Sequence, residues 1–408
     1  MLNKYKLLIG VLFKLPLHLI YWFSYYIPRN NKKWVFSAWE GKGYRGNSRY
    51  FFENISDSPC IAPVWITKNK NLFYEMRNSV NIKYAYSIKG FYDLATARVI
   101  IFSHGLYDVI PYITRGALLI SVGHATCPIK NMSFTKEISE MNFLRKLKMF
   151  ILSPYDHVKP AYEIVTSHYT KKSTMFLTVE KGNERDKVVP LGLPKSDYLM
   201  GVQKLATSKA RLLKDILHKL IPKMSNKDRL ILFLPTWRRD ERFNIFDFEY
   251  NSTKINNMLS KNNATMLINF HPFDESLRNS AVGSLGERVG IISCSGEEVT
   301  KLLCAADLFI TDYSSLYSDY LLFDRPMIFA KFAHNEYVRE RELQVDYDSL
   351  PGAVVTDWVE MATAVNKQLT SNGTEYKDDR KLWRDLIYSG TDDGKSCERI
   401  SEFIKSVL

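Results

Sequence analysis

The chain has 408 residues, of which 46% are hydrophobic, 25% charged and 13% aromatic. This composition excludes intrinsic disorder and leaves enough apolar material for two or three domains. The net charge of +12 predicts an anionic partner, which is nucleic acid, acidic lipid or a phosphorylated substrate. Zinc-ligand spacing, RNA-binding signatures and basic low-complexity arms are absent from the sequence, so we expect no nucleic-acid partner.

The cysteines are scattered and form no CxxC pair, which predicts a reducing compartment and no disulfide framework. They are Cys60, Cys127, Cys294, Cys304 and Cys397.

The N-terminal segment is apolar from residue 7 to residue 27, but Lys14, Pro16 and His18 interrupt it. These interruptions disfavour a membrane-spanning helix, and no small-residue cleavage site of a signal peptide follows. The tyrosines and tryptophan at residues 21–26, with basic residues on either side, favour a helix that lies in the membrane interface. A spanning helix and a helix packed on the domain are the alternatives.

Two series of short apolar runs alternate with helical patterns, which predicts βαβ units and parallel sheets. The first series of expected strands covers 33–38, 62–67, 81–86, 98–103 and 118–123. The second series covers 229–235, 265–270, 289–294, 307–311 and 326–330. Helical patterns cover the lysine-rich stretch 208–228 and the C-terminal stretches 380–390 and 397–408.

We therefore predict an α/β chain with two doubly wound halves and a cleft between them. The expected domains are an interfacial segment at 1–28, an N-terminal Rossmann-like domain at 29–195 and a C-terminal Rossmann-like domain at 196–408.

Polar side chains directly follow several of the predicted strands. Ligands of open α/β sheets bind at the carboxyl ends of the strands, so these side chains are candidates for a binding site. In the second half they are Thr236, Arg238, Arg239, His271, Asp312, Ser314 and Ser315. In the first half they are His104 and His124.

The serine pair stands where a strand ends and a helix begins. Free N–H groups and the positive end of the helix dipole attract anions there, so Ser314 and Ser315 suit a phosphate cradle. Plain capping of the helix is the alternative, although one such residue is enough for a cap. Asp319 lies four residues after Ser315, on the same helical face, where it suits a substrate hydroxyl or a nearby cation.

Arg238 and Arg239 suit a bidentate grip on phosphate oxygens, with a solvated basic turn as the alternative. Walker A, HExxH and GxSxG motifs are absent, and no stretch resembles a dedicated metal site. We therefore expect neither a cofactor nor a metal site.

The stretch LFITDYSSLYSDYLLFDRPMIFA, residues 308–330, resembles the signature of the CDP-glycerol glycerophosphotransferases, the teichoic acid primases and polymerases. Further motifs resemble the same family in the same order along most of the chain. They are WVFSAWEGKGYRGNSRYFFENI at 34–55, LGLPKSDYL at 191–199, LFLPTWRRD at 232–240, NFHPF at 269–273 and VDYDSLPGAVV at 345–355. Lys195 stands where the family has an arginine.

The resemblance implies the GT-B arrangement, with two facing Rossmann-like domains and an interfacial N-terminal region. It implies transfer of glycerol phosphate from CDP-glycerol to a hydroxyl of a lipid-linked saccharide or polymer, with release of CMP. Related members use CDP-ribitol. The enzyme would act peripherally at the cytoplasmic face of the cell membrane, against an anionic membrane surface, in teichoic acid or capsule assembly.

The resemblance also implies roles for individual residues. His124 lies in GHATCPIK, which is similar to the family's Trp-His-Gly-Thr-Pro-x-Lys segment, and would act as the base on the acceptor hydroxyl. Gly123 and Ala125 replace the family's tryptophan and glycine, which leaves the acceptor open. His271 would be the second catalytic residue and would help to hold the donor pyrophosphate. The implied donor-binding residues are Thr236, Arg238, Asp312, Ser314, Ser315 and Asp319.

Two other functions are compatible with parts of the sequence. A GT-B glycosyltransferase that uses a nucleotide sugar would share the fold, but the Asp-Tyr-Ser-Ser stretch favours polyol-phosphate transfer. A membrane-bound protein that only binds anionic polymer would explain the charge but not the residues at the strand ends. The choice between CDP-glycerol and CDP-ribitol, between primase and polymerase, and the oligomeric state are not predicted.

Overall fold

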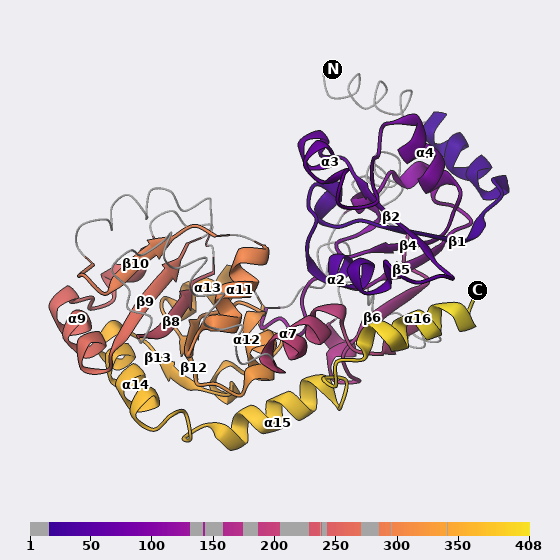
Figure 1. Cartoon of the computed structure of the whole chain (residues 1–408). Helices are drawn as coiled ribbons and strands as arrows, with labels where there is room; N and C mark the ends of the chain where they lie inside the picture. The colour runs from indigo at the N-terminus through magenta and orange to yellow at the C-terminus, as the bar shows by residue number, and fades with distance from the viewer. Residues whose placement is uncertain are drawn as a thin grey trace. The chain divides into compact units, whose positions relative to one another are not determined.

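The computed structural model describes residues 16–130, 142, 158–173, 187–204, 228–236, 238, 243–270, 285–294, 296–340 and 342–408. These residues form two compact α/β units, each built around one parallel sheet (Figure 1). The first unit contains the described residues of 16–124, 142–197 and 393–408. The second contains those of 125–130 and 198–392.

The sheet of the first unit has the strand order β3-β2-β1-β4-β5-β6-β7, with all neighbouring strands parallel. Its strands are β1 Asn30–Phe36, β2 Ala62–Thr67, β3 Ile82–Tyr84, β4 Ala97–Phe102, β5 Leu118–Ser121, β6 Tyr162–Val165 and β7 Val188–Pro190. The order reverses direction between β1 and β4, which is the topological switch point of a doubly wound sheet.

Helices cover both faces of this sheet because its strands are apolar on both sides. Trp34 and Phe36 of β1 pack on one face with residues of α2 and α16, whereas Val35 packs on the other face with residues of α4. The helices that the first unit contributes are α2 Gly46–Ile55, α3 Lys70–Met76, α4 Ile88–Ala95 and α16 Ser396–Ser406. Residues 16–23 are also helical and continue into a short 3-10 turn, Ser24–Tyr26.

The C-terminal helix α16 belongs to the first unit, although it is the last element of the chain. Its residues Cys397, Ile400 and Ile404 are buried in the core of the first sheet. The carboxylate of Asp197 accepts hydrogen bonds from the backbone N–H groups of Ser396 at 2.9 Å and Cys397 at 2.7 Å. The sequence led us to expect one domain over the whole stretch 196–408. In the structure residues 393–408 instead belong to the first unit, because α16 packs on the first sheet.

The sheet of the second unit has the strand order β10-β9-β8-β11-β12-β13, again with parallel neighbours throughout. Its strands are β8 Arg229–Leu234, β9 Ala264–Asn269, β10 Val289–Ile292, β11 Leu308–Thr311, β12 Met327–Ala330 and β13 Ala353–Val355. The switch point lies between β8 and β11. The helices are α9 Ser252–Lys261, α11 Glu297–Ala305, α12 Leu316–Tyr320, α13 His334–Glu340, α14 Trp358–Thr370 and α15 Lys377–Tyr388, and α7 Pro194–Lys204 joins the two units in sequence.

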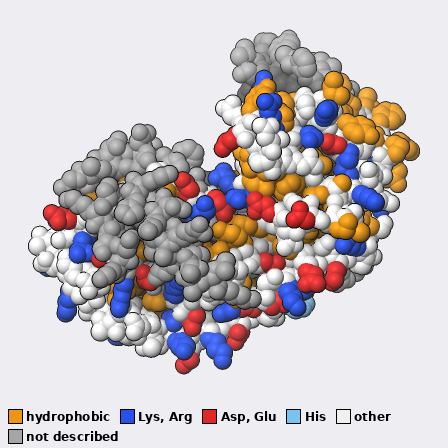
Figure 2. Space-filling view, in the orientation of Figure 1, with side chains coloured by type: hydrophobic (Ala, Val, Ile, Leu, Met, Phe, Trp, Pro, Cys, Tyr) orange, Lys and Arg blue, Asp and Glu red, His pale blue; other side chains and the backbone are white. Residues whose placement is uncertain are grey.

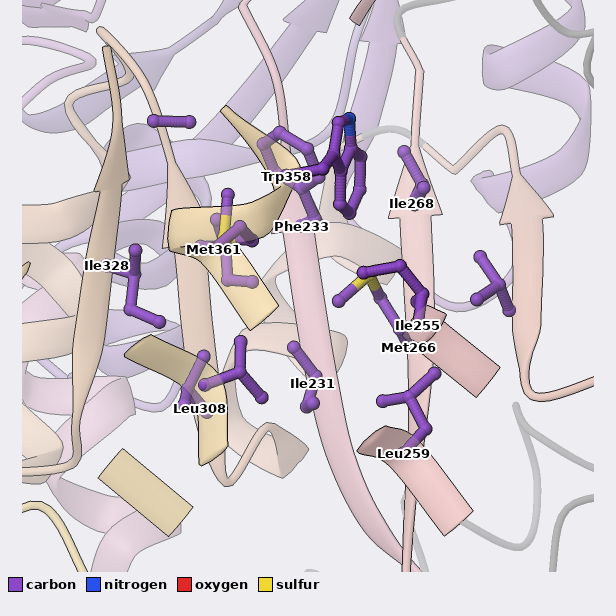
Figure 3. Close-up of a cluster of buried hydrophobic side chains, with 14 of the residues drawn as sticks. Ile231, Phe233, Ile255, Leu259, Met266, Ile268, Leu308, Ile328, Trp358 and Met361 are labelled. Carbon is purple, nitrogen blue, oxygen red and sulfur yellow. The ribbon is translucent and has the colours of Figure 1, made fainter. Parts of the chain in front are cut away.

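Figure 3 shows the core of the second unit, in which α9 and α14 cover the central strands. Trp358 of α14 packs against Phe233 of β8 with ring centroids 5.9 Å apart. Its indole N–H donates to the carbonyl of Ile245 at 2.7 Å, so the buried polar atom is satisfied. This core fixes the central strands whose ends carry the candidate site.

Every strand that the sequence predicted is present, and β6, β7 and β13 were not predicted. These three have three or four residues each. Periodicity is weak at that length, so only some of the strands that are this short, such as β3, were recognised. The predicted stretches 380–390 and 397–408 lie in or overlap α15 and α16, whereas the stretch 208–228 lies almost entirely outside the described residues. Among the described residues, no helix has the length and apolar character that crossing a bilayer requires.

Candidate active site

The candidate site of the second unit lies at the switch point of its sheet. Strands β8 and β11 are parallel neighbours, with Leu234 paired to Thr311 at their carboxyl ends. The residues that follow, Thr236 after β8 and Asp312 after β11, therefore meet at one edge of the sheet. This is where open α/β sheets bind ligands.

The carboxylate of Asp312 organises this edge. Its Oδ1 accepts hydrogen bonds from the Thr236 backbone N–H at 2.8 Å, the Thr236 hydroxyl at 2.5 Å and the Tyr313 backbone N–H at 2.6 Å. Asp312 is only 3% exposed, and a buried carboxylate needs such donors to offset its lost hydration. Asp312 thus ties the end of β8 to the turn that leads into α12.

Arg238 completes this network from the β8 side. Its guanidinium pairs with Asp312 Oδ2 at 3.4 Å and donates to the backbone carbonyls of Phe332 at 3.0 Å and Ala333 at 3.4 Å. It also lies over the Phe243 ring, 4.1 Å from the centroid. The Arg238 side chain is 7% exposed, and both of its terminal nitrogens already have acceptors.

The two serines stand at the beginning of α12 and behave differently. The Ser314 hydroxyl accepts the Leu316 backbone N–H at 3.3 Å, which is a local capping interaction. Ser315 is the residue that precedes the helix, yet its side chain makes no capping hydrogen bond. Both serines are partly exposed, so the Ser315 hydroxyl is the one that the cap leaves available.

Asp319, on the same short helix, is 6% exposed and accepts the Thr126 hydroxyl at 3.0 Å. Thr126 belongs to the segment 125–130, which is attached to the second unit. The Ile129 carbonyl accepts the Gln344 backbone N–H at 2.9 Å, and Lys130 forms a bridge with Leu343. The residues directly after His124 are therefore anchored on the second unit.

A cluster of aromatic side chains behind Asp312 was not recognised in the sequence. The Tyr313 and Tyr337 rings stack at 3.7 Å with planes 9° apart, and the Tyr313 hydroxyl lies 2.8 Å from His334 Nδ1. The Tyr347 hydroxyl donates to the Asp312 carbonyl at 3.2 Å. Burial raises the pKa of both Tyr313 and Tyr347, so these phenols stay neutral and their hydroxyls remain able to donate hydrogen bonds. Only Tyr313 and Tyr347 lay inside motifs that sequence resemblance had singled out.

The first unit carries a second cluster at its own switch point. Trp39 follows β1, His104 follows β4 and His124 follows β5. The His104 and His124 rings stack with centroids 4.4 Å apart and planes 14° apart, and Trp39 lies 4.6 Å from His104. The Arg45 guanidinium lies over Trp39, 3.7 Å from the ring centroid. His124 is exposed, so this stack supports a ring that solvent can reach.

The backbone beneath this stack is held by buried polar groups. Asp108, which is 1% exposed, accepts the N–H groups of Glu40 at 2.6 Å, Ser103 at 2.9 Å and His104 at 3.0 Å. Trp39 and Glu40 have φ of +54° and +56°, a left-handed conformation that non-glycine residues adopt only when their surroundings enforce it. Asp108 supplies that enforcement through the Glu40 N–H.

Asn47 fixes the loop that carries His124. Its side-chain amide donates to the carbonyls of Val122 at 3.0 Å and Gly123 at 3.1 Å, and its oxygen accepts the Lys195 N–H at 2.9 Å. Asn47 and Lys195 both lie in motifs that resemble the family, which was the signal that could have identified this role.

His104 is neutral in this environment. Burial, helped by the positive charge of Arg45, lowers its pKa to about 4. The Ser103 hydroxyl lies 2.8 Å from His104 Nδ1 and orients the ring. His104 therefore stacks on His124 as an uncharged imidazole.

His271 and Arg239, both expected to contact the donor, lie outside the described residues. Within the part of the chain that the structure describes, His, Cys, Asp and Glu side chains form no group of three that could hold a metal ion. Thr236, Arg238 and Asp312 come together in the second unit, Ser314, Ser315 and Asp319 lie on the adjoining α12, and His124 lies in the first unit.

Comparison with known proteins identifies the family of the chain. The family model of CDP-Glycerol:Poly(glycerophosphate) glycerophosphotransferase matches residues 19–406. The chain is 24% identical to the teichoic acid ribitol-phosphate primase of Bacillus spizizenii over 394 residues, which cover 94% of this chain and 93% of the relative. It is 28% identical to the teichoic acid ribitol-phosphate polymerase TarL of Staphylococcus aureus over 300 residues, which cover 70% of this chain and 47% of the relative.

The solved structure of the wall teichoic acid polymerase TagF matches the whole chain with a TM-score of 0.73 at 17% identity and covers 98% of that chain. This likeness confirms the predicted GT-B-like pair of parallel-sheet units. Since the family model spans nearly the entire sequence, this chain belongs to the CDP-glycerol:poly(glycerophosphate) glycerophosphotransferase family.

Proposed function

We propose that this enzyme transfers a polyol phosphate, with glycerol phosphate as the first candidate, from a CDP-activated donor to a hydroxyl of a lipid-linked saccharide or polymer. CMP is released, and the product is a teichoic acid or capsule-type surface polymer. The observation that carries the proposal is the Asp312 network with Thr236 and Arg238, which fixes a serine pair at the switch point of the second sheet. Membership of the family supplies the reaction class.

In this proposal the second unit binds the donor. The Ser315 hydroxyl and the backbone N–H groups at the beginning of α12 donate hydrogen bonds to the diphosphate, as charge-assisted donors do for phosphate oxygens. Asp312 and Arg238 act as positioning residues that hold this turn. Asp319 accepts a hydroxyl of the polyol or keeps Thr126 in place, and His271 is a further proposed donor ligand.

The proposed base is His124 of the first unit. It takes the proton of the acceptor hydroxyl while the hydroxyl oxygen attacks the phosphorus that carries the polyol. A new oxygen–phosphorus bond forms, the bond from that phosphorus to the bridging oxygen breaks, and CMP leaves with the bridging oxygen. A histidine whose pKa lies near neutral suits this step, which contributes about 10²–10⁴-fold to the rate. Donor positioning and charge neutralisation supply the remainder.

The polyol of the donor is either glycerol or ribitol. The description of the family names CDP-glycerol, whereas the names of two relatives contain ribitol phosphate. A solved TagF structure was obtained after a soak with CDPG, which supports a CDP-linked donor for this fold. We further propose that the enzyme acts at the cytoplasmic face of the cell membrane as a peripheral protein.

The test compares three candidate donors in separate reactions with the full chain and a lipid-linked saccharide acceptor. The protein is incubated with CDP-glycerol, CDP-ribitol or a UDP-sugar, and release of CMP or UDP is measured with mass analysis of the lipid product. We expect CMP release with one CDP-polyol and an acceptor heavier by one or more polyol phosphates. Release of UDP with a sugar-bearing product, and none of CMP, would favour the glycosyltransferase instead.

Variants assign the base. His124→Ala should keep affinity for the CDP-polyol and lose CMP release, whereas His168→Ala, at an exposed histidine of the same unit, should match the wild type. Wild-type turnover in His124→Ala would remove His124 from the mechanism.

A further inference from the structure

The loop between β1 and α2 has the sequence GKGYRG at residues 41–46, which is the Gly-x-Gly-x-x-Gly spacing of phosphate-binding loops. It connects a strand to a helix at the switch point of the first sheet, which is where such loops occur. A dinucleotide-binding loop is followed about 20 residues later by an acidic residue for the ribose, whereas residues 58–74 contain no acidic side chain. The loop therefore indicates an anion site without dinucleotide recognition.

Arg45 of this loop has a guanidinium that lacks a hydrogen-bond acceptor. Its Nε atom is buried without a partner, and the guanidinium lies over the Trp39 ring, 3.7 Å from the centroid. A Cβ at residue 43 would come within 2.8 Å of Nε, so Gly43 allows the guanidinium to lie against the loop. Burial lowers the pKa of Arg45, although an arginine stays charged at neutral pH. A half-buried cation without a counter-charge is costly unless a ligand supplies an anion.

Further donors lie beside Arg45 at the beginning of α2. The helix has no side-chain cap, so the N–H groups of its first turn are not satisfied within the helix. The Ser48 hydroxyl in this turn is fully buried and has no hydrogen-bond partner. The indole nitrogen of Trp39 lies 3.9 Å from the point where a Cβ would stand on Gly46, and no other atom lies within 4 Å of that point. The approach to the first turn is therefore open and surrounded by donors.

The other basic side chains around this loop already have acceptors. Lys42 pairs with Glu40 Oε2 at 2.6 Å, and Lys68 donates to the Tyr107 carbonyl at 2.6 Å. Figure 2 shows basic and acidic side chains interspersed over the visible face of the first unit. Arg45 differs from them, since no carboxylate pairs with it in the described part of the chain.

A stack of side chains leads from Arg45 to the proposed base. The Arg45 guanidinium lies over Trp39, the Trp39 ring lies 4.6 Å from His104, and the His104 ring lies 4.4 Å from His124. All four residues belong to the first unit, so their arrangement is set by one sheet. An anion bound to Arg45 would therefore lie about one polyol or one saccharide ring away from a hydroxyl at His124.

We propose that Arg45 and the first turn of α2 bind a phosphate group that the acceptor already carries, near the hydroxyl that His124 deprotonates. The guanidinium donates two hydrogen bonds to the phosphate oxygens, and N–H groups at the beginning of α2 donate to the same anion. We call these donors the anion subsite. The proposal rests on the proposed function and deepens it, because the acceptor becomes a phosphate-bearing molecule. The phosphate is either a polyol phosphodiester at the end of a polymer or the phosphate that links a saccharide to its lipid.

The experiment uses the full chain and three water-soluble acceptors built on one short alkyl disaccharide. The first is uncharged, the second is extended by one glycerol phosphate with a free hydroxyl, and the third has a diphosphate between the disaccharide and the alkyl chain. CMP release from the CDP-polyol gives kcat and KM for each acceptor, and calorimetric titration gives binding without turnover.

The proteins are wild type, Arg45→Gln, Arg45→Lys and the control Arg77→Gln. Arg77 is an exposed arginine of the same unit that lies over the Tyr74 ring, 5.1 Å from the centroid. The control therefore removes the same charge and the same kind of ring contact away from the anion subsite. Thermal unfolding of each variant shows that the fold is kept.

Wild type and Arg77→Gln should bind one of the phosphate-bearing acceptors more tightly than the uncharged one, and the preferred acceptor identifies the source of the phosphate. Arg45→Gln should raise the KM of that acceptor about 10- to 100-fold and leave the KM of the uncharged acceptor and of the CDP-polyol unchanged. Arg45→Lys should recover part of the loss, because an ammonium group keeps the charge but not the planar pair of donors.

The proposal is overturned if wild type does not prefer a phosphate-bearing acceptor, or if Arg45→Gln impairs all three acceptors equally, since Arg45 would then only support the loop. An increase in the KM of the CDP-polyol alone would also overturn it, because Arg45 would serve the donor. If no protein releases CMP, while wild type binds a phosphate-bearing acceptor in the titration and Arg45→Gln does not, the proposed reaction fails and the anion subsite stands.

Discussion

The imidazole ring of His104 lies nearly parallel to that of His124, with centroids 4.4 Å apart. His104 is held by Ser103 and by Asp108 below it, and its pKa of about 4 keeps it uncharged at the pH at which a base must work. His104 thus orients His124 without placing a second positive charge beside it. This relationship makes His104 a positioning residue for the proposed base.

The first prediction concerns this stack. His104→Ala should lower kcat by about tenfold, because an aromatic pair contributes about 0.5–1.5 kcal/mol and the His124 ring would lose its orientation. His104→Phe should restore kcat to within about threefold, since a phenyl ring can stack. The KM for the CDP-polyol should change little in both variants. If His104→Phe is as slow as His104→Ala, the hydrogen bond with Ser103 matters and the stacking does not.

A second prediction concerns acid stability. The pKa of His104 is lowered from 6.5 to about 4 in the folded chain, so the unfolded chain binds more protons between these values. The stability that neutral His104 contributes is present above about pH 6.5 and is lost as the pH falls toward 4. His104→Phe should therefore lose less stability than wild type between pH 7 and pH 4.5, by about 1–2 kcal/mol after allowance for partial exposure. Urea unfolding at the two pH values measures this, with His168→Phe as the control.

Asp312 provides a third prediction. Asp312→Asn places an amide among donors that need an acceptor, so the free energy of unfolding should fall by about 2–4 kcal/mol. Asp348→Asn should lower it by less than about 1 kcal/mol, although Asp348 lies only 2.6 Å from Lys331, because its side chain is 67% exposed. Equal losses in denaturant unfolding would mean that burial of the Asp312 network does not matter.

A fourth prediction distinguishes the roles of Ser314 and Ser315. Ser314→Ala removes a local cap and should lower the free energy of unfolding by about 1 kcal/mol. Ser315→Ala should leave stability unchanged and weaken binding of the CDP-polyol by about 10- to 100-fold, which corresponds to one charge-assisted hydrogen bond. Calorimetric titration and thermal unfolding provide the two readings, with Ser371→Ala as the control. Wild-type donor affinity in Ser315→Ala would contradict its proposed role.

A fifth prediction tests the attachment of residues 125–130 to the second unit. Thr126→Val and Asp319→Ala should each destabilise the chain, and the double variant should lose about 1 kcal/mol less than the sum of the two. The cycle is measured by denaturant unfolding. Additivity within about 0.3 kcal/mol would show that the 3.0 Å hydrogen bond contributes nothing net.

The sequence was sufficient to predict the central strands and the residues at their ends, because a buried parallel strand is a continuous apolar run followed by an abrupt polar residue. Thr236 and Asp312 were found in this way. The hydrogen bonds between Thr236 and Asp312 were not predicted, because they require β8 and β11 to be neighbours. Strand order is not encoded in the local sequence pattern. Arg238 was identified at the end of β8, but its orientation toward Asp312 and two carbonyls depends on the aromatic side chains of distant segments.

The same limit applies to the first unit. His104 and His124 were each identified at a strand end, but their stacking requires β4 and β5 to be neighbours. The left-handed turn at Trp39 carries no glycine at that position and therefore no sequence signal. Asp108, which enforces the turn, reads as an ordinary acidic loop residue.

The return of α16 to the first sheet has a consequence for biosynthesis. A ribosome makes the first sheet early, yet Cys397, Ile400 and Ile404, which cover one of its faces, emerge only after the whole second unit. One apolar face of the first sheet therefore stays incompletely covered during translation of the second unit. A premature stop just before residue 393 would spare the second unit and leave the N-terminal half as a substrate for chaperones and proteases.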